Sequence, residues 1–120
     1  MMSGIGVDLC CPKRIEKVYK NFGKKFLKRI FTDREIKDLE KSLNKKYGSF
    51  HRIAGRFAAK EAISKAMGTG IGKNLSFKDI EITHDKKGAP TVSLKNSDKK
   101  VSVTISHEKN MAVAFAIVTS

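Results

Sequence analysis

The segment RFAAKEAISKAMG, residues 56–68, predicts one long central helix that runs from about Phe50 to Met67. Gly68 is a typical stop at its C-terminal end. Four alanines recur at every fourth position and make a ridge of small side chains, which comprises Ala54, Ala58, Ala62 and Ala66. Another backbone can approach such a ridge closely. Glu61 borders the ridge, so its carboxylate lies on a surface made mostly of methyl groups.

The segment GIGVDL, residues 4–9, predicts a strand with one nearly empty face. Its apolar side chains point to one side, whereas Gly4, Gly6 and Asp8 point to the other. If the glycine face meets the alanine ridge, Asp8 and Glu61 converge. Two carboxylates about 4 Å apart repel by roughly 4 kcal/mol at an effective dielectric near 20, so the pair needs a shared proton, a lysine or a divalent cation.

Magnesium is the chemically apt partner for these two acids, because Mg²⁺ is typically held by one or two carboxylates while waters and substrate phosphates complete its shell. In a chain of formal charge +13, the surrounding lysines would then hold the phosphates. The pattern alone leaves two structural alternatives open. Glu61 can pair with Lys65 one helical turn later, and Asp8 can cap the helix that begins near Pro12.

Further helices are predicted before the central one. Helical spacing is present over residues 12–22 and 24–31. Thr32 and Glu35 form a capping-box pattern, which opens a third helix that extends to about Lys46.

Strand patterns follow the central helix. HDKKGAP, residues 84–90, is a turn-rich connection between an apolar segment around Ile80 and the strand TVSL, residues 91–94, which predicts a hairpin. Residues 101–107 alternate strictly. In residues 111–118, bulky side chains on one side face alanines on the other, so we expect both faces of this last strand to be buried.

The order of strand, helices and then strands predicts an α+β fold with a mostly antiparallel sheet packed against helices. A chain of 120 residues is long enough to bury a real core but too short for two domains of ordinary size. We therefore expect a single domain over residues 1–120.

The charge balance favours an anionic partner, since 25 lysines and arginines face 12 acids and the pI is about 9.9. A lysine-rich solvated surface is the alternative. Nucleic acid is disfavoured, because the chain has no Trp, only two Tyr and no aromatic-rich strand on which bases could stack.

The sequence predicts neither membrane insertion nor disulfide bonding. The longest apolar run, residues 111–118, is far short of the roughly 20 residues that cross a bilayer. The only cysteines, Cys10 and Cys11, are adjacent, which disfavours an ordinary disulfide, and two are too few for a structural zinc site. We therefore expect a reducing, cytoplasmic setting.

The histidines allow both structural and functional interpretations. His107 continues the apolar face of its strand where the strand ends, so it is either a partly buried, hydrogen-bonded residue or one that reaches a phosphate or a reacting hydroxyl. His51 and His84 lie in polar surroundings, which predicts surface positions. The glycines of GTGIGKN, residues 68–74, lack the spacing of a phosphate-binding P-loop.

Several segments together resemble the bacterial holo-(acyl-carrier-protein) synthases, which belong to the 4′-phosphopantetheinyl transferase superfamily. These segments are GIGVDL followed by KRI, the block AGRFAAKEAISKAMGTGIG with LSFKDIEI behind it, the GAP turn and the VSVTISH strand. The resemblance implies the fold of that superfamily. It also implies that the 4′-phosphopantetheine arm of coenzyme A is moved onto a serine of apo acyl carrier protein, with release of adenosine 3′,5′-bisphosphate, in support of fatty acid biosynthesis.

The resemblance also implies roles for individual residues. Asp8 and Glu61 match magnesium ligands, and Lys65 matches a lysine near the diphosphate and the attacking serine. We expect Glu61, directly or through a water, to take the serine proton. The remaining coenzyme A contacts would be Arg56 and His107 around the 3′-phosphate, Gly88 and Pro90 beside the adenine, and Lys46 at a phosphate, with Lys45 as the alternative.

Docking of the carrier protein would involve Arg14, Lys25, Phe26 and Arg29, with lysines at places where relatives often carry arginine. Acyl carrier proteins are acidic, so the basic first half of the chain would speed their encounter. The resemblance further implies a homotrimer with active sites at subunit interfaces. A metal-dependent phosphodiesterase, which would use the same two acids on another phosphate ester, is the rival enzyme class.

Overall fold

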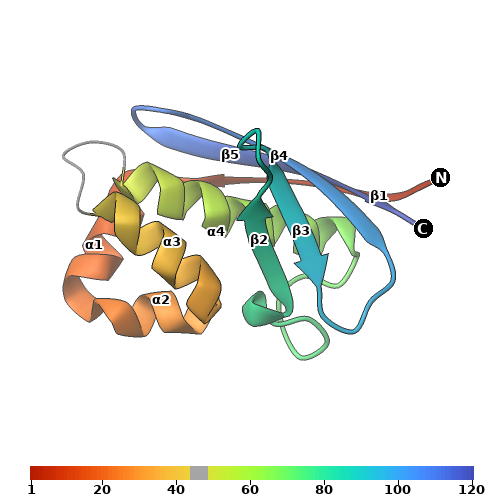
Figure 1. Ribbon diagram of the computed structural model, residues 1–120, viewed down its shortest axis with the longest axis horizontal. Coiled ribbons are helices and arrows are strands. Elements are labelled where there is room, and N and C mark those ends of the chain that lie inside the picture. The colour runs from red at the N-terminus through yellow and green to blue at the C-terminus, as the bar shows by residue number, and fades with distance from the viewer. Residues whose placement is uncertain (44–48) are drawn as a thin grey trace.

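The computed structural model describes residues 1–43 and 49–120 of the chain. The helices are α1 (Pro12–Phe22), α2 (Lys24–Ile30), α3 (Asp33–Leu43) and α4 (Ser49–Ala66), with a short 3-10 helix at Phe77–Asp79. The strands are β1 (Met2–Cys10), β2 (Ile80–His84), β3 (Pro90–Leu94), β4 (Lys100–Glu108) and β5 (Met111–Thr119). This is the predicted α+β arrangement (Figure 1). No helix in the described ranges is long and apolar enough to cross a membrane.

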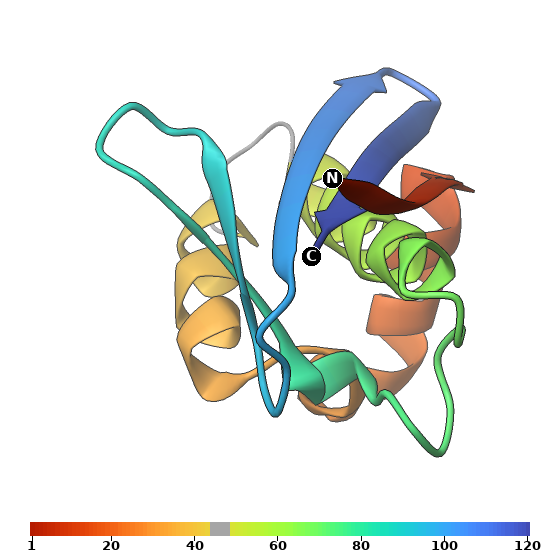
Figure 2. The ribbon, with the colours of Figure 1, turned by 90° about the vertical axis from the view of Figure 1, so that its right-hand side faces the viewer.

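Every strand pairing in the described part of the chain is antiparallel, as predicted. One sheet has the order β1–β5–β4, so the N-terminal strand pairs with the C-terminal one. The predicted hairpin forms a separate ribbon, β2–β3, which stands beside the first sheet (Figure 2).

The alanine ridge of α4 packs against the inner face of the β1–β5–β4 sheet. All four ridge alanines are buried, and so are the alanines of β5 that face them, namely Ala112, Ala114 and Ala116. β1 lies so close to α4 that a methyl group at Gly4 or Gly6 would overlap a backbone carbonyl oxygen of the helix. Side chains alternate along a strand, so Asp8 is on the same face as these glycines. The predicted meeting of the two small-residue surfaces is confirmed.

A buried ion pair ties α4 to the other helices. Lys60 and Glu35 are both fully buried, and Lys60 Nζ lies 2.6 Å from Glu35 Oε1. Nζ also donates to the carbonyls of Ile30 and Phe77, at 2.9 and 3.0 Å. Glu35 accepts hydrogen bonds from the backbone amides of Thr32 and of β2, the first of which completes the predicted capping box. Buried charges are tolerated when they are paired and hydrogen-bonded, as both are here.

The outer face of the β1–β5–β4 sheet departs from the prediction, because the bulky side of β5 is not buried within the chain. Met111 and Phe115 are each 37% exposed. On β1, the exposed fractions of Ile5, Val7 and Leu9 are 56%, 51% and 61%. The described helices all lie on the opposite side of the sheet, so none covers this outer apolar face (Figure 1).

We expect Gly6→Ala to lower the free energy of unfolding by roughly 1–3 kcal/mol, because the added methyl group overlaps the Ala62 carbonyl and forces β1 away from α4. Urea unfolding followed by circular dichroism measures the change. Gly72→Ala is the matched control. No described heavy atom lies within 4 Å of the methyl group that it adds, so a change of about 0.5 kcal/mol at most is expected. Equal stability of Gly6→Ala and wild type would contradict the close packing.

Candidate active site

Asp8, Glu61 and Lys65 meet where β1 crosses the C-terminal half of α4. Lys65 Nζ lies 2.9 Å from Asp8 Oδ1 and donates to the carbonyl of Val7 at 3.2 Å. Glu61 precedes Lys65 by one helical turn, and its charge interacts with that of Asp8. The sequence left three partners that could offset the two negative charges, namely a shared proton, a lysine or a divalent cation. The structure places a lysine, Lys65, at Asp8.

The two structural alternatives for these acids are not formed among the described residues. Lys65 forms its ion pair with Asp8 rather than with Glu61. The N-terminus of α1 has Cys11 as its cap residue and receives no side-chain capping hydrogen bond, so Asp8 does not cap it.

The surroundings of Glu61 favour its protonated form. Burial raises the pKa of this carboxyl, and the negative charge of Asp8 raises it further, whereas Lys65 acts in the opposite direction. A carboxylate with this environment gains stability from any additional positive charge. A cation bound between the two acids would therefore stabilise both ionised carboxylates.

The donor set at this point fits a hard cation that keeps open coordination positions. The described residues contain no group of three or more His, Cys, Asp or Glu side chains that could hold an ion, so the protein supplies two carboxylates. Mg²⁺ is commonly bound in this way and retains several waters, whereas structural zinc requires four protein ligands. Lys65 contacts one of the two oxygens of Asp8, and the second oxygen can accept another ligand.

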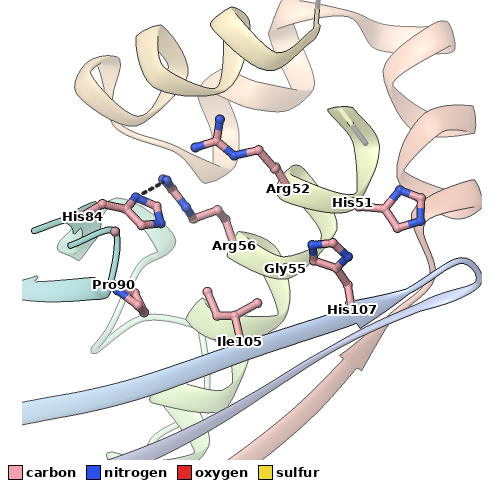
Figure 3. A pocket seen from close by; sticks show the side chains of 9 residues that line it. His51, Arg52, Gly55, Arg56, His84, Pro90, Ile105 and His107 are labelled. Atoms are coloured by element: carbon pink, nitrogen blue, oxygen red, sulfur yellow. Dashed lines mark hydrogen bonds between the residues drawn. The ribbon is translucent and has the colours of Figure 1, made fainter. Parts of the chain in front are cut away.

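A cavity of about 310 Å³ opens on the N-terminal half of α4, between that helix, the β2–β3 hairpin and the end of β4 (Figure 3). Its wall combines cationic side chains, imidazole rings and a proline. The lining residues are His51, Arg52, Gly55, Arg56, His84, Gly88, Pro90, Ile105 and His107.

Arg56 anchors the polar wall of this cavity, and only 3% of its side chain is exposed. Its Nη2 donates to Asp38 Oδ2 at 2.7 Å and to His84 Nδ1 at 2.8 Å, and its Nη1 donates to the carbonyl of Ile82 at 3.1 Å. Arg52 also donates to Asp38 Oδ2, at 2.9 Å. Burial alone would raise the pKa of Asp38, but the two arginines outweigh burial and lower that pKa. One acid therefore orients two guanidinium groups.

The predicted coenzyme A contacts divide into those that the structure brings together and one that it does not describe. Arg56, Gly88, Pro90 and His107 all line the same cavity. His107 is exposed, not partly buried, because β4 ends where the cavity opens to solvent. Lys46, with its alternative Lys45, lies outside the described residues.

The sequence analysis assigned no function to three polar residues that line this cavity. His51 and His84 were expected at the surface without a role, and Arg52 was not considered, yet all three line the wall. Arg52 could have been found, because it precedes Arg56 by one helical turn and shares its face. His84 could not, since no local pattern predicts that β2 lies against α4.

A second hollow, of about 510 Å³, lies on α1 and α2. Its lining residues are Val18, Phe22, Lys25, Phe26, Lys28 and Arg29. Three of the four predicted docking residues are therefore gathered here. The fourth, Arg14, is exposed on α1 and precedes Val18 by one helical turn.

In a comparison with protein-family sequence models, the one for the 4′-phosphopantetheinyl transferase superfamily matches residues 4–118. The chain belongs to this superfamily. A superfamily member from Bacillus cytotoxicus, named holo-(acyl-carrier-protein) synthase, is 47% identical, and the alignment covers 100% of this chain and 98% of the relative. A protein of the same name from Ehrlichia chaffeensis is 42% identical over 98% of this chain and 96% of its own length.

Solved structures of superfamily members confirm the predicted fold. The holo-(acyl-carrier-protein) synthase of Bacillus anthracis, solved in complex with CoA (3′,5′-ADP), is 42% identical. It matches with a TM-score of 0.88 over 100% of this chain and 98% of that one. The synthase of Neisseria meningitidis matches with a TM-score of 0.87 at 34% identity, over the whole of both chains.

We expect Asp8→Asn to lower the pKa of Glu61 in the metal-free protein, because the substitution removes a neighbouring negative charge and frees the Lys65 ammonium. A pH titration of the Glu61 carboxyl carbon by NMR measures the shift. The control is Asp33→Asn, on the exposed first turn of α3, which should leave the Glu61 titration unchanged. An unchanged or higher pKa of Glu61 in Asp8→Asn would mean that the two acids do not share one site.

Proposed function

We propose that this chain is a holo-(acyl-carrier-protein) synthase, which transfers the 4′-phosphopantetheine group from coenzyme A to a serine of apo acyl carrier protein. Adenosine 3′,5′-bisphosphate is the second product. The observation that carries the proposal is that Asp8 of β1 meets Glu61 and Lys65 of α4, the helix that also lines a cationic cavity.

The two sites lie on different faces of α4. Glu61 follows Arg56 by five residues, which on a helix is roughly 8 Å of rise and about 140° of rotation. Coenzyme A has a 3′-phosphate on its nucleoside and a diphosphate next to it. In the interfacial active site proposed below, the cavity of one copy and the acids of a neighbouring copy would contact the same coenzyme A.

The binding roles are those that the resemblance implies, and the lining of one cavity by these residues supports them. The 3′-phosphate is held by Arg56 and His107, and the adenine lies beside Gly88 and Pro90. An arginine whose guanidinium is already oriented by Asp38 and Ile82 loses little freedom when it binds a phosphate. Lys46 is assigned to a phosphate by resemblance alone.

In the reaction, the serine oxygen of the carrier protein attacks the phosphorus that bears the pantetheine arm. A new P–O bond forms, and the bond from this phosphorus to the bridging oxygen of the diphosphate breaks. Glu61, directly or through a water, accepts the serine proton. Lys65 stabilises the negative charge on the departing adenosine 3′,5′-bisphosphate.

Asp8 and Glu61 are the residues that would hold magnesium. When bound there, Mg²⁺ supplies positive charge to the diphosphate oxygens.

The hollow on α1 and α2 is the docking surface for the carrier protein in this proposal. Lys25, Phe26 and Arg29 line it, and Phe22 beside them is 63% exposed. Apolar side chains surrounded by cations suit an acidic partner that also presents an apolar patch. Arg14 extends the surface along α1.

We also propose a cytoplasmic homotrimer whose active sites lie at subunit interfaces. The outer apolar face of the β1–β5–β4 sheet supports this proposal, because it exposes Ile5, Val7, Leu9, Met111 and Phe115 together. Copies of the same chain would cover it. The two free cysteines, Cys10 and Cys11, are compatible with a reducing compartment.

The direct test is incubation of the protein with magnesium, coenzyme A and an apo carrier protein, followed by mass spectrometry of the carrier. Only a transferase adds the 4′-phosphopantetheine mass to the carrier serine. Cleavage of coenzyme A without a change in the carrier would favour a phosphodiesterase instead. No reaction of either kind would contradict both enzymes.

We expect Glu61→Gln and Asp8→Ala each to lower kcat/KM by at least about 100-fold, because each removes a carboxylate from the proposed metal site. Circular dichroism should show an unchanged fold. Asp98→Asn, in the exposed loop before β4, is the control and should keep wild-type turnover. Wild-type turnover in Glu61→Gln would refute the proposed site.

The double variant Lys25→Glu with Arg29→Glu should raise the KM for the carrier protein about tenfold or more, while the KM for coenzyme A changes little. Lys99→Glu with Lys100→Glu makes the same change in net charge at exposed residues of another surface, so it serves as the control. Equal losses for the two double variants would show that net charge, not the α1–α2 surface, governs docking.

Phe115→Glu should dissociate the proposed trimer, because it places a charge in the middle of the outer apolar face. Light scattering coupled to size-exclusion chromatography measures the mass. Lys41→Glu, exposed on α3, should leave the oligomer intact. A monomeric wild-type protein would contradict the proposed assembly.

A further inference from the structure

All three histidines of the chain line the same cavity, although they come from three separate segments. His51 lies at the start of α4, His84 at the end of β2 and His107 near the end of β4. Figure 3 shows His51 and His107 together at one end of the cavity and His84 beside Arg56 at the other. The hydrogen bonds of these rings separate them into two kinds.

His84 is held in its neutral form. A guanidinium group can only donate, so His84 Nδ1 must accept the hydrogen bond from Arg56 Nη2. A second proton on the ring would occupy that nitrogen, break the bond and place two cations in contact. Burial and then the charge of Arg56 lower the pKa of His84 accordingly. His84 is therefore not the group that gains a proton in this cavity.

His51 can gain a proton without losing its hydrogen bond. Its Nε2 lies 2.9 Å from the carbonyl oxygen of Lys109, and a carbonyl only accepts, so Nε2 carries the hydrogen. Nδ1 is then the nitrogen that takes a second proton. The ring of His107 lies 5.5 Å from that of His51, centroid to centroid. Two charged rings at this separation repel, so an anion is needed before both become positive.

The charged groups around the pair leave room for such an anion. On α4, Arg52 and Arg56 line the same cavity, and both are paired with the single acid Asp38 of α3. Asp85 follows His84 at the hairpin. The β4–β5 turn contributes Glu108 and Lys109, and on α1 the ring of Tyr19 packs against Phe50, next to His51. None of the described residues that line the cavity is acidic, and Asp38 is the acid with which both guanidinium groups pair.

We propose that His51 and His107 together take up a proton when a phosphate monoester enters this cavity, so that the binding of coenzyme A is coupled to pH through its 3′-phosphate. This inference rests on the proposed function, which places the 3′-phosphate at Arg56 and His107. It adds His51 as a residue that determines phosphate affinity and leaves His84 as an uncharged hydrogen-bond partner of Arg56.

The direction of the effect follows from linkage. A group that gains a proton on binding strengthens binding as the pH falls. The preference for coenzyme A over dephospho-coenzyme A should therefore increase as the pH falls from about 7.5 toward about 6.5. Contact with arginine favours the dianionic phosphate, which would release protons from the ligand. The sign of the proton change thus distinguishes the protein from the ligand as its source.

Isothermal titration calorimetry in buffers of different ionisation enthalpy measures the number of protons exchanged per ligand bound. The full chain is titrated at about pH 7.5 with coenzyme A and, separately, with dephospho-coenzyme A, which retains the diphosphate and lacks the 3′-phosphate. Proton exchange at the diphosphate and at Asp8, Glu61 and Lys65 is common to both ligands and cancels in the difference. We expect net uptake of a fraction of a proton with coenzyme A and little or none with dephospho-coenzyme A.

Three variants assign the uptake to residues. His51→Gln keeps a donor for the Lys109 carbonyl and cannot be charged, and His107→Gln removes the other ring, so each should reduce the uptake. His84→Gln changes the same cavity without removing a group that gains a proton, so uptake per bound coenzyme A should persist even where affinity falls. This contrast separates proton coupling from a general loss of binding.

Three results overturn the inference while leaving the proposed function intact, two from the wild-type protein and one from a variant. One is binding of coenzyme A with no uptake or with net release, and the other is equal uptake with both ligands. Undiminished uptake in His51→Gln would also overturn it. Absence of heat with either ligand, in every buffer, would contradict the proposed function itself and the inference with it.

Discussion

The candidate active site depends on the close approach of two backbones, those of β1 and α4. Gly4 and Gly6 leave no side chains on the inner face of the strand, and the alanines of the helix leave only methyl groups on theirs. The strand therefore lies directly on the helix carbonyls, and Asp8 comes within 2.9 Å of Lys65 and within electrostatic reach of Glu61. Larger side chains would separate these groups, and the interaction between charges falls as the distance grows.

The helix α4 carries residues of both the cavity and the pair of acids, so it fixes their positions relative to each other. Its buried side carries Lys60, whose ion pair with Glu35 fixes how the helix is rotated against α2, α3 and β2. Arg56 precedes Lys60 by one helical turn and lines the cavity, whereas Lys65 contacts Asp8 of β1. Loss of one partner of a buried ion pair commonly destabilises a protein by about 3–5 kcal/mol, so this rotation is strongly maintained. A single rigid element thus relates the cavity at Arg56 to the pair of acids.

The features of the fold that depend on residues close together in the chain were predicted from the sequence. The capping box at Thr32 and Glu35, the stop at Gly68 and the turn before Pro90 each depend on residues near one another in the chain, and all are present. The glycine and alanine spacings predicted even the contact of β1 with α4. The partner of Lys65 was not predicted, nor was the place of His84 beside Arg56, because both depend on how distant segments are oriented. The exposed side of β5 was mistaken for a buried one, since apolar alternation does not say whether the chain itself or another copy covers a face.

The central claim is that Asp8 and Glu61 hold one divalent ion beside the diphosphate of coenzyme A. Anomalous X-ray diffraction from crystals grown with coenzyme A and Mn²⁺ in place of Mg²⁺ tests it most directly, because manganese is located independently of the protein atoms. The account predicts one manganese peak beside both acids and the diphosphate. A manganese peak only elsewhere in the molecule, while coenzyme A is bound, would contradict it.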